Sequence, residues 1–370
     1  MVSAGALVAT GAHAPPHLLA FCNADLPAIG SIDIFALHAA ARLSGARLER
    51  PLMSVKFMRF FHRHSAPGRP RAGISSTPRH LPVPFDGPRP IAFMHIPKTS
   101  GTAVISGLMT ALASPTVVGG FDRSLFGSFQ DFDSLQGSAR CQIYDLPASL
   151  RKDAALVAGH FAFSTLRDAY PLAQRFTILR EPMSRLLSHW LFWRQRIDED
   201  LAPWGNWADR VRQARKPLTD FAGDPLLACQ TDNLTLRMLP WPHPLVPAAQ
   251  FIDTVHDGQL VRQAMARLLE FDFVDVVEDG AFLHRLQCWL GRPFAHNRVN
   301  ETRAIPQQFR TPLHRELTPE AYDLLDARSR LDFRLWAAIA ARRLPERDIF
   351  RLRAQTILAN VARHSVLMGC

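Results

Sequence analysis

The chain has 370 residues, and 43 Lys and Arg against 33 Asp and Glu give it a formal net charge of +10. Hydrophobic residues make up 47% and charged residues 21%, which is a globular composition and excludes a disordered chain or a coiled coil. Only four of the basic residues are Lys, and the Arg side chains that dominate suit pairing with phosphate, sulfate or carboxylate. The positive balance therefore indicates an anionic partner without naming it.

The cysteines and the apolar segments indicate where in the cell the protein is expected. The cysteines are scattered, odd in number and never in a CxxC pair, so they predict neither a disulfide framework nor a zinc site; they are Cys22, Cys141, Cys229, Cys288 and Cys370. No stretch approaches ~20 uninterrupted apolar residues, so no transmembrane helix is predicted. The N-terminus lacks Lys and Arg before Arg42, which is untypical of a signal peptide. A cytoplasmic location is expected.

Residues 1–89 are predicted to form a basic, Pro-rich and largely disordered N-terminal extension. Seven Lys and Arg and no acidic residue fall between Arg50 and Phe85, and seven prolines lie between Pro67 and Pro90. Residues 1–49 carry a net charge of −1, so residues 90–370 carry only +4. Most of the positive charge thus lies outside the segment that is predicted to fold.

Residues 90–370 are predicted to form one domain. Short apolar runs of strand type alternate with segments whose apolar residues recur at helical spacing. The predicted strands are 91–97, 154–161, 175–180 and 271–278. Helices are expected after the first strand, from Pro182, before Gly291, and over most of the chain from Leu313 onward. This alternation predicts an α/β fold with a parallel β-sheet flanked by helices and a helical C-terminal part.

The segment KTSGT follows the first predicted strand and precedes a helix, where unpaired backbone amides and the helix dipole favour an anion. Lys98 adds a positive charge, Thr99, Ser100 and Thr102 add hydroxyl donors, and Gly101 lets the backbone approach a ligand closely. An ordinary capped turn is the alternative. Lys98 precedes the glycine, unlike the lysine of the GxxxxGK[ST] motif, which disfavours an ATPase or GTPase.

A second candidate anion site lies in FTILREPMSRLLSHW. Arg180 stands at the end of the third predicted strand, and Ser188 lies about two helical turns further on. A guanidinium and a hydroxyl in these positions could bind a phosphate together. Arg185 shares a helix face with Ser188. An amphipathic helix with solvated arginines is the alternative for this motif alone.

These two motifs together resemble sulfotransferases that use 3′-phosphoadenosine 5′-phosphosulfate (PAPS). HIPKTSGT (95–102) resembles their 5′-phosphosulfate loop in the form found in the heparan sulfate 2-O-sulfotransferase type, which usually has Gly where Ser100 stands. The Arg, eight residues, Ser spacing is similar to their 3′-phosphate motif. The resemblance covers about residues 90–300. It implies the P-loop-type sulfotransferase fold, with residues 98–103, from Lys98 to Ala103, at the 5′-phosphosulfate and Arg180 and Ser188 at the 3′-phosphate.

The resemblance also implies a base and a closing segment. GHFAF is similar to the family's Gly-His segment, which makes His160 the candidate base; it also follows a strand, at the edge where α/β sheets bind ligands. His95 is the competing candidate. NRVNETR (297–303) is similar to a segment that closes over the nucleotide, which implicates Asn300, Thr302 and Arg303. DNLTLRML (232–239) weakly resembles the segment before the acceptor cleft.

The resulting hypothesis is a sulfuryl transfer from PAPS to a hydroxyl, with a sugar or glycan as the acceptor. Lys98 would neutralise charge at the breaking bond, and no metal is required. Nucleic acid is not expected as a partner, and no transmembrane segment is expected. Two other functions are considered. One is a small-molecule kinase that uses ATP and Mg²⁺, and the other is a non-catalytic protein that binds polyanions through its arginines.

Overall fold

The computed structural model describes residues 85–368, except 88, 114–115 and 295–302. Internal contacts divide the chain into two units, residues 1–80 and 81–370. The predicted N-terminal extension therefore lies almost entirely outside the described residues. Within the second unit, the backbone amide of Phe85 donates to the carbonyl of Trp289 at 3.1 Å, and that of Asp86 donates to Oε1 of Gln174 at 2.9 Å. Contacts with the folded domain thus begin at Phe85, five residues before residue 90, where the domain was predicted to begin.

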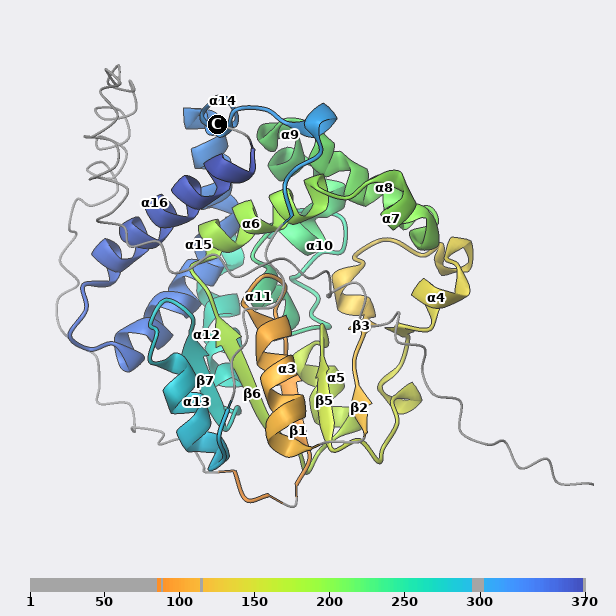
Figure 1. Cartoon of the computed structure of the whole chain (residues 1–370), viewed down its shortest axis with the longest axis vertical. Coiled ribbons are helices and arrows are strands. Elements are labelled where there is room, and N and C mark those ends of the chain that lie inside the picture. Colours follow the sequence, from red (N-terminus) through yellow and green to blue (C-terminus); the bar gives the residue numbers. More distant parts are fainter. Residues whose placement is uncertain (1–84, 88, 114–115, 295–302, 369–370) are drawn as a thin grey trace, which may run out of the picture. The chain divides into compact units, whose positions relative to one another are not determined.

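A five-stranded parallel sheet forms the centre of this unit (Figure 1). The predicted parallel sheet is confirmed, with one strand, β2, more than the four that the sequence predicts. The strand order is β2-β5-β1-β6-β7, with every neighbouring pair parallel. The strands are β1 (Ile91–Met94), β2 (Val117–Val118), β5 (Leu156–Gly159), β6 (Gln174–Leu179) and β7 (Phe273–Val276), and a separate pair is formed by β3 (Phe121–Asp122) and β4 (Ile143–Tyr144). Because β1 lies between β5 and β6, the segments that follow these three strands meet at one edge of the sheet.

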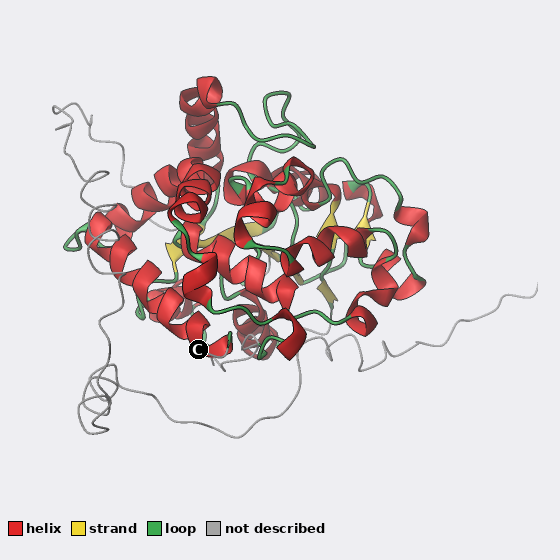
Figure 2. Ribbon diagram, turned by 90° about the horizontal axis from the view of Figure 1, so that it is seen from above, coloured by secondary structure: helices red, strands yellow, loops and turns green. Residues whose placement is uncertain are grey.

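Helices cover both faces of the sheet (Figure 2). Their bounds are α3 (Gly101–Leu112), α4 (Gly137–Arg140), α5 (Phe163–Ala169), α6 (Pro182–Arg194), α7 (Asp198–Leu201), α8 (Trp207–Arg212), α9 (Leu218–Gly223), α10 (Ala228–Thr231), α11 (Leu234–Met238), α12 (Asp257–Leu268), α13 (Phe282–Leu290), α14 (Leu313–Glu316), α15 (Pro319–Arg343) and α16 (Ile349–Leu367). The predicted stop at Gly291 is confirmed, since it ends α13 in the left-handed conformation at φ 62°.

The main core lies between the sheet and the helices α3 and α13. The side chains of alternate strand residues, such as Phe93, Phe176 and Phe273, point to this face, as the period of two in a strand requires. They pack against Leu108 of α3 and Trp289 of α13. The rings of Phe93 and Phe176 stack with their centroids 4.4 Å apart. This packing fixes the position from which α3 begins.

Three helices lie beyond the carboxyl ends of the strands: α6, α15 and α16 (Figure 1). α6 begins directly after β6, with Pro182 in its first turn and the carboxylate of Glu181 accepting from the amides of Met183 and Ser184 at 3.2 and 2.7 Å. This cap satisfies amides that the helix itself leaves unpaired. α15 and α16 both pack against α6. The helical C-terminal part therefore covers the edge of the sheet where the predicted site lies.

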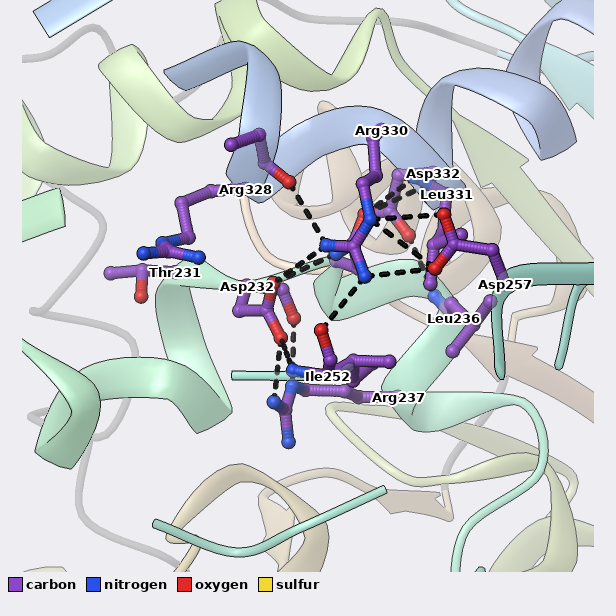
Figure 3. A network of polar contacts seen from close by, with 12 residues as sticks. Thr231, Asp232, Leu236, Arg237, Ile252, Asp257, Arg328, Arg330, Leu331 and Asp332 are labelled. Carbon is purple, nitrogen blue, oxygen red and sulfur yellow. Dashed lines mark hydrogen bonds and ion pairs between the residues drawn. The ribbon is translucent and has the colours of Figure 1, made fainter. Parts of the chain in front are cut away.

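A buried polar network joins α11 to α15 (Figure 3). Asp232 forms an ion pair with Arg237 at 2.7 Å, and the carboxylate of Asp332 accepts from the amides of Thr235 and Leu236 at 2.9 and 2.8 Å. Arg330 of α15 approaches Asp232 at 3.8 Å. Asp232 and Arg237 belong to the segment 232–239 that weakly resembles an acceptor-cleft motif. Both side chains are committed to internal contacts.

Replacing Asp232 with alanine is expected to lower the free energy of unfolding by about 3–5 kcal/mol, because Arg237 would be left as a buried charge without its ion pair. Urea unfolding followed by circular dichroism measures the change. Asp209→Ala is the matched control, since Asp209 pairs with Arg212 at an exposed site and such pairs contribute less than about 1 kcal/mol. Equal losses in the two variants would contradict a structural role for the network.

Candidate functional site

The loop after β1 is held in an unusual backbone conformation. Lys98 and Ser100 both have left-handed φ angles, of 70° and 65°, which side-chain-bearing residues adopt at a cost of roughly 1–2 kcal/mol each. Gly at position 100 would avoid this cost, which explains why the similar motifs usually carry it there. Ser100 gives α3 no side-chain cap. The Ser100 side chain therefore does not occupy the backbone amides in the first turn of α3, which includes Ala103.

Two residues of the loop do something other than what the sequence predicts. Thr99 is fully buried, and its hydroxyl donates to the carbonyl of Ile96 at 2.8 Å. This hydrogen bond stabilises the loop. A Cβ on Gly101 would lie 1.9 Å from Nε2 of His95. Gly101 is thus required by the imidazole that packs over it. Thr102 is half-buried in the first turn of α3.

Replacing Gly101 with alanine is expected to lower the free energy of unfolding by about 1–3 kcal/mol, because the His95 ring would have to leave a packed position. That ring lies 5.4 Å from Phe93 and 4.3 Å from His160, measured between centroids. Urea unfolding measures the loss. Gly137→Ala is the control, since an added Cβ there meets nothing within 4 Å. A Gly101→Ala variant as stable as its control would contradict the packing argument.

Lys98 and Arg180 lie together, although 82 residues separate them. An Arg180 guanidinium nitrogen donates to the backbone carbonyl of Lys98 at 3.0 Å. The Lys98 ammonium lies over the ring of Phe192 in α6, 4.1 Å from its centroid. Burial, together with the charges of Arg180, Arg196 and Arg363, lowers the pKa of Lys98 to about 7. Such a gathering of cations favours an anion between them.

Acidic side chains also lie near Arg180, where β7 ends. Glu278 follows β7 and accepts from the Glu181 amide at 2.6 Å and from the Trp336 indole at 2.9 Å. Burial raises the pKa of Glu278 to about 7. Because this carboxyl group is only partly ionised near pH 7, it offsets the charge of Arg180 incompletely.

His160 follows β5 and is oriented by the backbone of β1. Its Nδ1 lies 2.7 Å from the carbonyl oxygen of His95. A carbonyl only accepts, so Nδ1 carries the proton and Nε2 keeps a lone pair. Burial lowers the pKa of His160 to about 4, with a further contribution from Lys98. The ring is therefore neutral at pH 7 and able to accept a proton at Nε2.

His95 differs from His160 in its surroundings. Burial, His160 and Lys98 together hold the pKa of His95 well below its usual value. Its ring is only 8% exposed and is packed between Phe93, His160 and Gly101. His95 supports the site through its backbone carbonyl and through packing. His160 is the half-buried one of the two.

α6 carries the predicted Arg185 and Ser188 and adds His189, which the sequence did not single out. Both ring nitrogens of His189, and Nε and one terminal nitrogen of Arg185, lack a hydrogen-bond partner among the described residues. Burial and the charges of Arg185, Lys98 and His160 lower the pKa of His189. Ser188, on the same helix, is buried. The sequence feature that points to His189 is its i, i+4 spacing from Arg185, and amphipathic helices in general share this spacing.

The remaining predicted residues lie elsewhere or cannot be placed. Asn300 and Thr302 lie outside the described residues. Arg303 is described and exposed. Trp190, Trp193 and Trp207 are buried in the core around α6. Within the described part of the chain, no group of three or more His, Cys, Asp or Glu side chains is placed to hold a metal, and none of its helices is long and apolar enough to cross a bilayer.

Comparisons with known proteins give similarity to solved structures. No protein-family model and no curated protein matches the sequence. The structure is similar to the crystal structure of a sulfotransferase from Alicyclobacillus acidocaldarius, with 17% sequence identity and a TM-score of 0.33, over 72% of this chain and 99% of that chain. A similarity of this size does not establish the family to which the chain belongs.

Proposed function

We propose that this protein is a sulfotransferase that passes a sulfuryl group from PAPS to a hydroxyl of a sugar or glycan. The observation that carries the proposal is the contact between Arg180 and the Lys98 carbonyl, which joins the two anion motifs of the sequence at one edge of the sheet. A donor with phosphate groups at both its 5′ and 3′ positions requires two such sites, whereas ATP has phosphates at one end only.

Each residue has a role that follows from its surroundings. The strained loop from Lys98 to Thr102, with Ala103, would hold the 5′-phosphosulfate through backbone amides and the Lys98 charge. Arg180 and Ser188 would hold the 3′-phosphate. His160 would accept the proton of the acceptor hydroxyl at Nε2 while the hydroxyl oxygen takes the sulfuryl group. Lys98 would neutralise the charge left on the departing bisphosphate.

Calorimetry with adenosine 3′,5′-bisphosphate and with ATP plus Mg²⁺ tests the proposal. Tight binding of the bisphosphate that needs no metal is expected, and preference for Mg·ATP would favour a kinase instead. Lys98→Ala and Arg180→Ala should weaken bisphosphate binding strongly, and the exposed Lys152→Ala and Arg151→Ala serve as matched controls. Anion binding that is steeply salt-dependent and survives both site variants would indicate a non-catalytic polyanion-binding protein.

The acceptor class is tested separately by transfer of radiolabelled sulfate from PAPS to glycan, lipid and protein extracts. Label in the glycan fraction is the expected result. Label confined to lipid or protein would contradict the glycan assignment and leave the sulfuryl transfer in place. Lys98→Ala enzyme, which should transfer no label to any fraction, controls for contaminating activity.

A further inference from the structure

The helix α16 brings a polar face to the site, beyond the part of the chain that carries the sequence resemblance. Asn360 and His364 are one turn apart and therefore lie on the same side of the helix. Both are buried, with 7% and 2% of their surface exposed. Buried Asn and His are uncommon unless their polar atoms are paired. The partners of these two residues therefore indicate what the helix does.

Asn360 links α16 to the second anion motif. Its Oδ1 accepts from an Arg180 guanidinium nitrogen at 3.3 Å, and its amide donates to the backbone carbonyl of Ser184 at 2.8 Å. Arg180 is thus held between the Lys98 carbonyl on one side and Asn360 on the other. α16 therefore contributes to the orientation of the guanidinium that is assigned to the 3′-phosphate.

His364 has no such partner. Neither of its ring nitrogens has a hydrogen-bond partner among the described residues. Burial is the main cause that lowers the pKa of His364, and the charged groups that add to this effect, Arg180, Arg363 and Lys98, are all cations. An unpaired polar group in a buried position is costly, and this cost is removed when a ligand supplies the missing partner. The surrounding cations indicate that this ligand is an anion.

We propose that α16 forms one wall of the 3′-phosphate site, where His364 donates a ring N–H to a phosphate oxygen and Asn360 positions Arg180. This inference rests on the proposed function, since it assigns the anion to a nucleotide 3′-phosphate. A neutral imidazole has one N–H donor, which is enough for one phosphate oxygen. The charge on the phosphate would be balanced by Arg180 and Arg363.

Calorimetric titration of His364→Ala with adenosine 3′,5′-bisphosphate and with adenosine 5′-monophosphate tests the inference. The variant should lose roughly ten- to hundredfold in affinity for the bisphosphate, as expected for a hydrogen bond to a charged group. Its affinity for the monophosphate should stay within about twofold of the wild type, since only the 3′-phosphate is contacted. Gln355→Ala, an exposed residue of the same helix, is the control. His364→Gln keeps an N–H donor and should retain most of the affinity.

Several outcomes would overturn the inference. Unchanged bisphosphate affinity in His364→Ala would assign the ring to a buried water or to packing. An equal loss for both nucleotides would show a general disturbance of the site. If the variants fail to fold, hydrogen exchange of the wild-type protein tests the inference instead. The bisphosphate, and not the monophosphate, should slow amide exchange in residues 357–368. Wild-type protein that binds neither nucleotide would instead refute the proposed function itself.

Discussion

Replacing His160 with alanine is expected to reduce the rate of sulfuryl transfer by about 10²–10⁴-fold, the usual contribution of a positioned general base. Binding of adenosine 3′,5′-bisphosphate should stay close to the wild-type value, because the imidazole acts on the acceptor rather than on the nucleotide. Transfer of radiolabelled sulfate under saturating PAPS measures the rate, and calorimetry measures the binding. A loss of rate with intact binding separates a catalytic role from a structural one.

Two comparisons sharpen this experiment. His314→Ala removes an exposed histidine of α14 and should leave the rate unchanged. His160→Gln keeps a side chain that can donate to the His95 carbonyl but has no basic nitrogen, so it should be as slow as the alanine variant. Full activity in either His160 variant would eliminate His160 as the base and return the role to His95.

Binding of adenosine 3′,5′-bisphosphate is expected to take up protons at alkaline pH. Because the pKa of Lys98 is about 7 in the free protein, about nine-tenths of the side chain is neutral at pH 8. A bound anion favours the charged form and raises this pKa, so close to one proton per nucleotide should be taken up at pH 8 and about half of that at pH 7. Affinity should accordingly fall as the pH rises above 7.

Calorimetry in buffers of different ionisation enthalpy counts the protons. A phosphate monoester has its second pKa near 6, so the nucleotide itself changes little between pH 7 and 9. Lys98→Met should bind more weakly and lose the uptake at pH 8, whereas Lys152→Met, at an exposed position, should behave as the wild type. Uptake that persists in Lys98→Met would assign the protons to His189 or His364, whose ring nitrogens also lack partners.

The sequence predicts much of the sheet because its central strands are buried on both faces. β1, β5, β6 and β7 all fall within predicted apolar runs or within one residue of them. β2 was not predicted, since Val117–Val118 is too short to give a periodic signal. Pro182 and Gly291 act through local backbone chemistry, so the start of α6 and the end of α13 could be predicted from single residues.

The candidate site also has residues that the sequence predicts and residues that it does not. Lys98, His160 and Arg180 follow strands, so their meeting at one edge of a parallel sheet follows from the predicted fold. Asn360 and His364 could not be predicted, because nothing local tells which element a helix will pack against. The steric reason for Gly101 could not be predicted either. The His95 ring that occupies the space of a Cβ at this position comes from the preceding strand segment, and only the folded structure shows this contact.

The hydrogen bond between Arg180 and Asn360 has a consequence for biosynthesis. It spans 180 residues, so the two halves of the second anion site leave the ribosome at very different times. A nascent chain that has emerged as far as α15 already contains all five strands and the Lys98 loop, but its Arg180 has no amide oxygen to hold it. Because a domain generally folds as a unit during synthesis, Arg180 would reach its observed position only after α16 has left the ribosome.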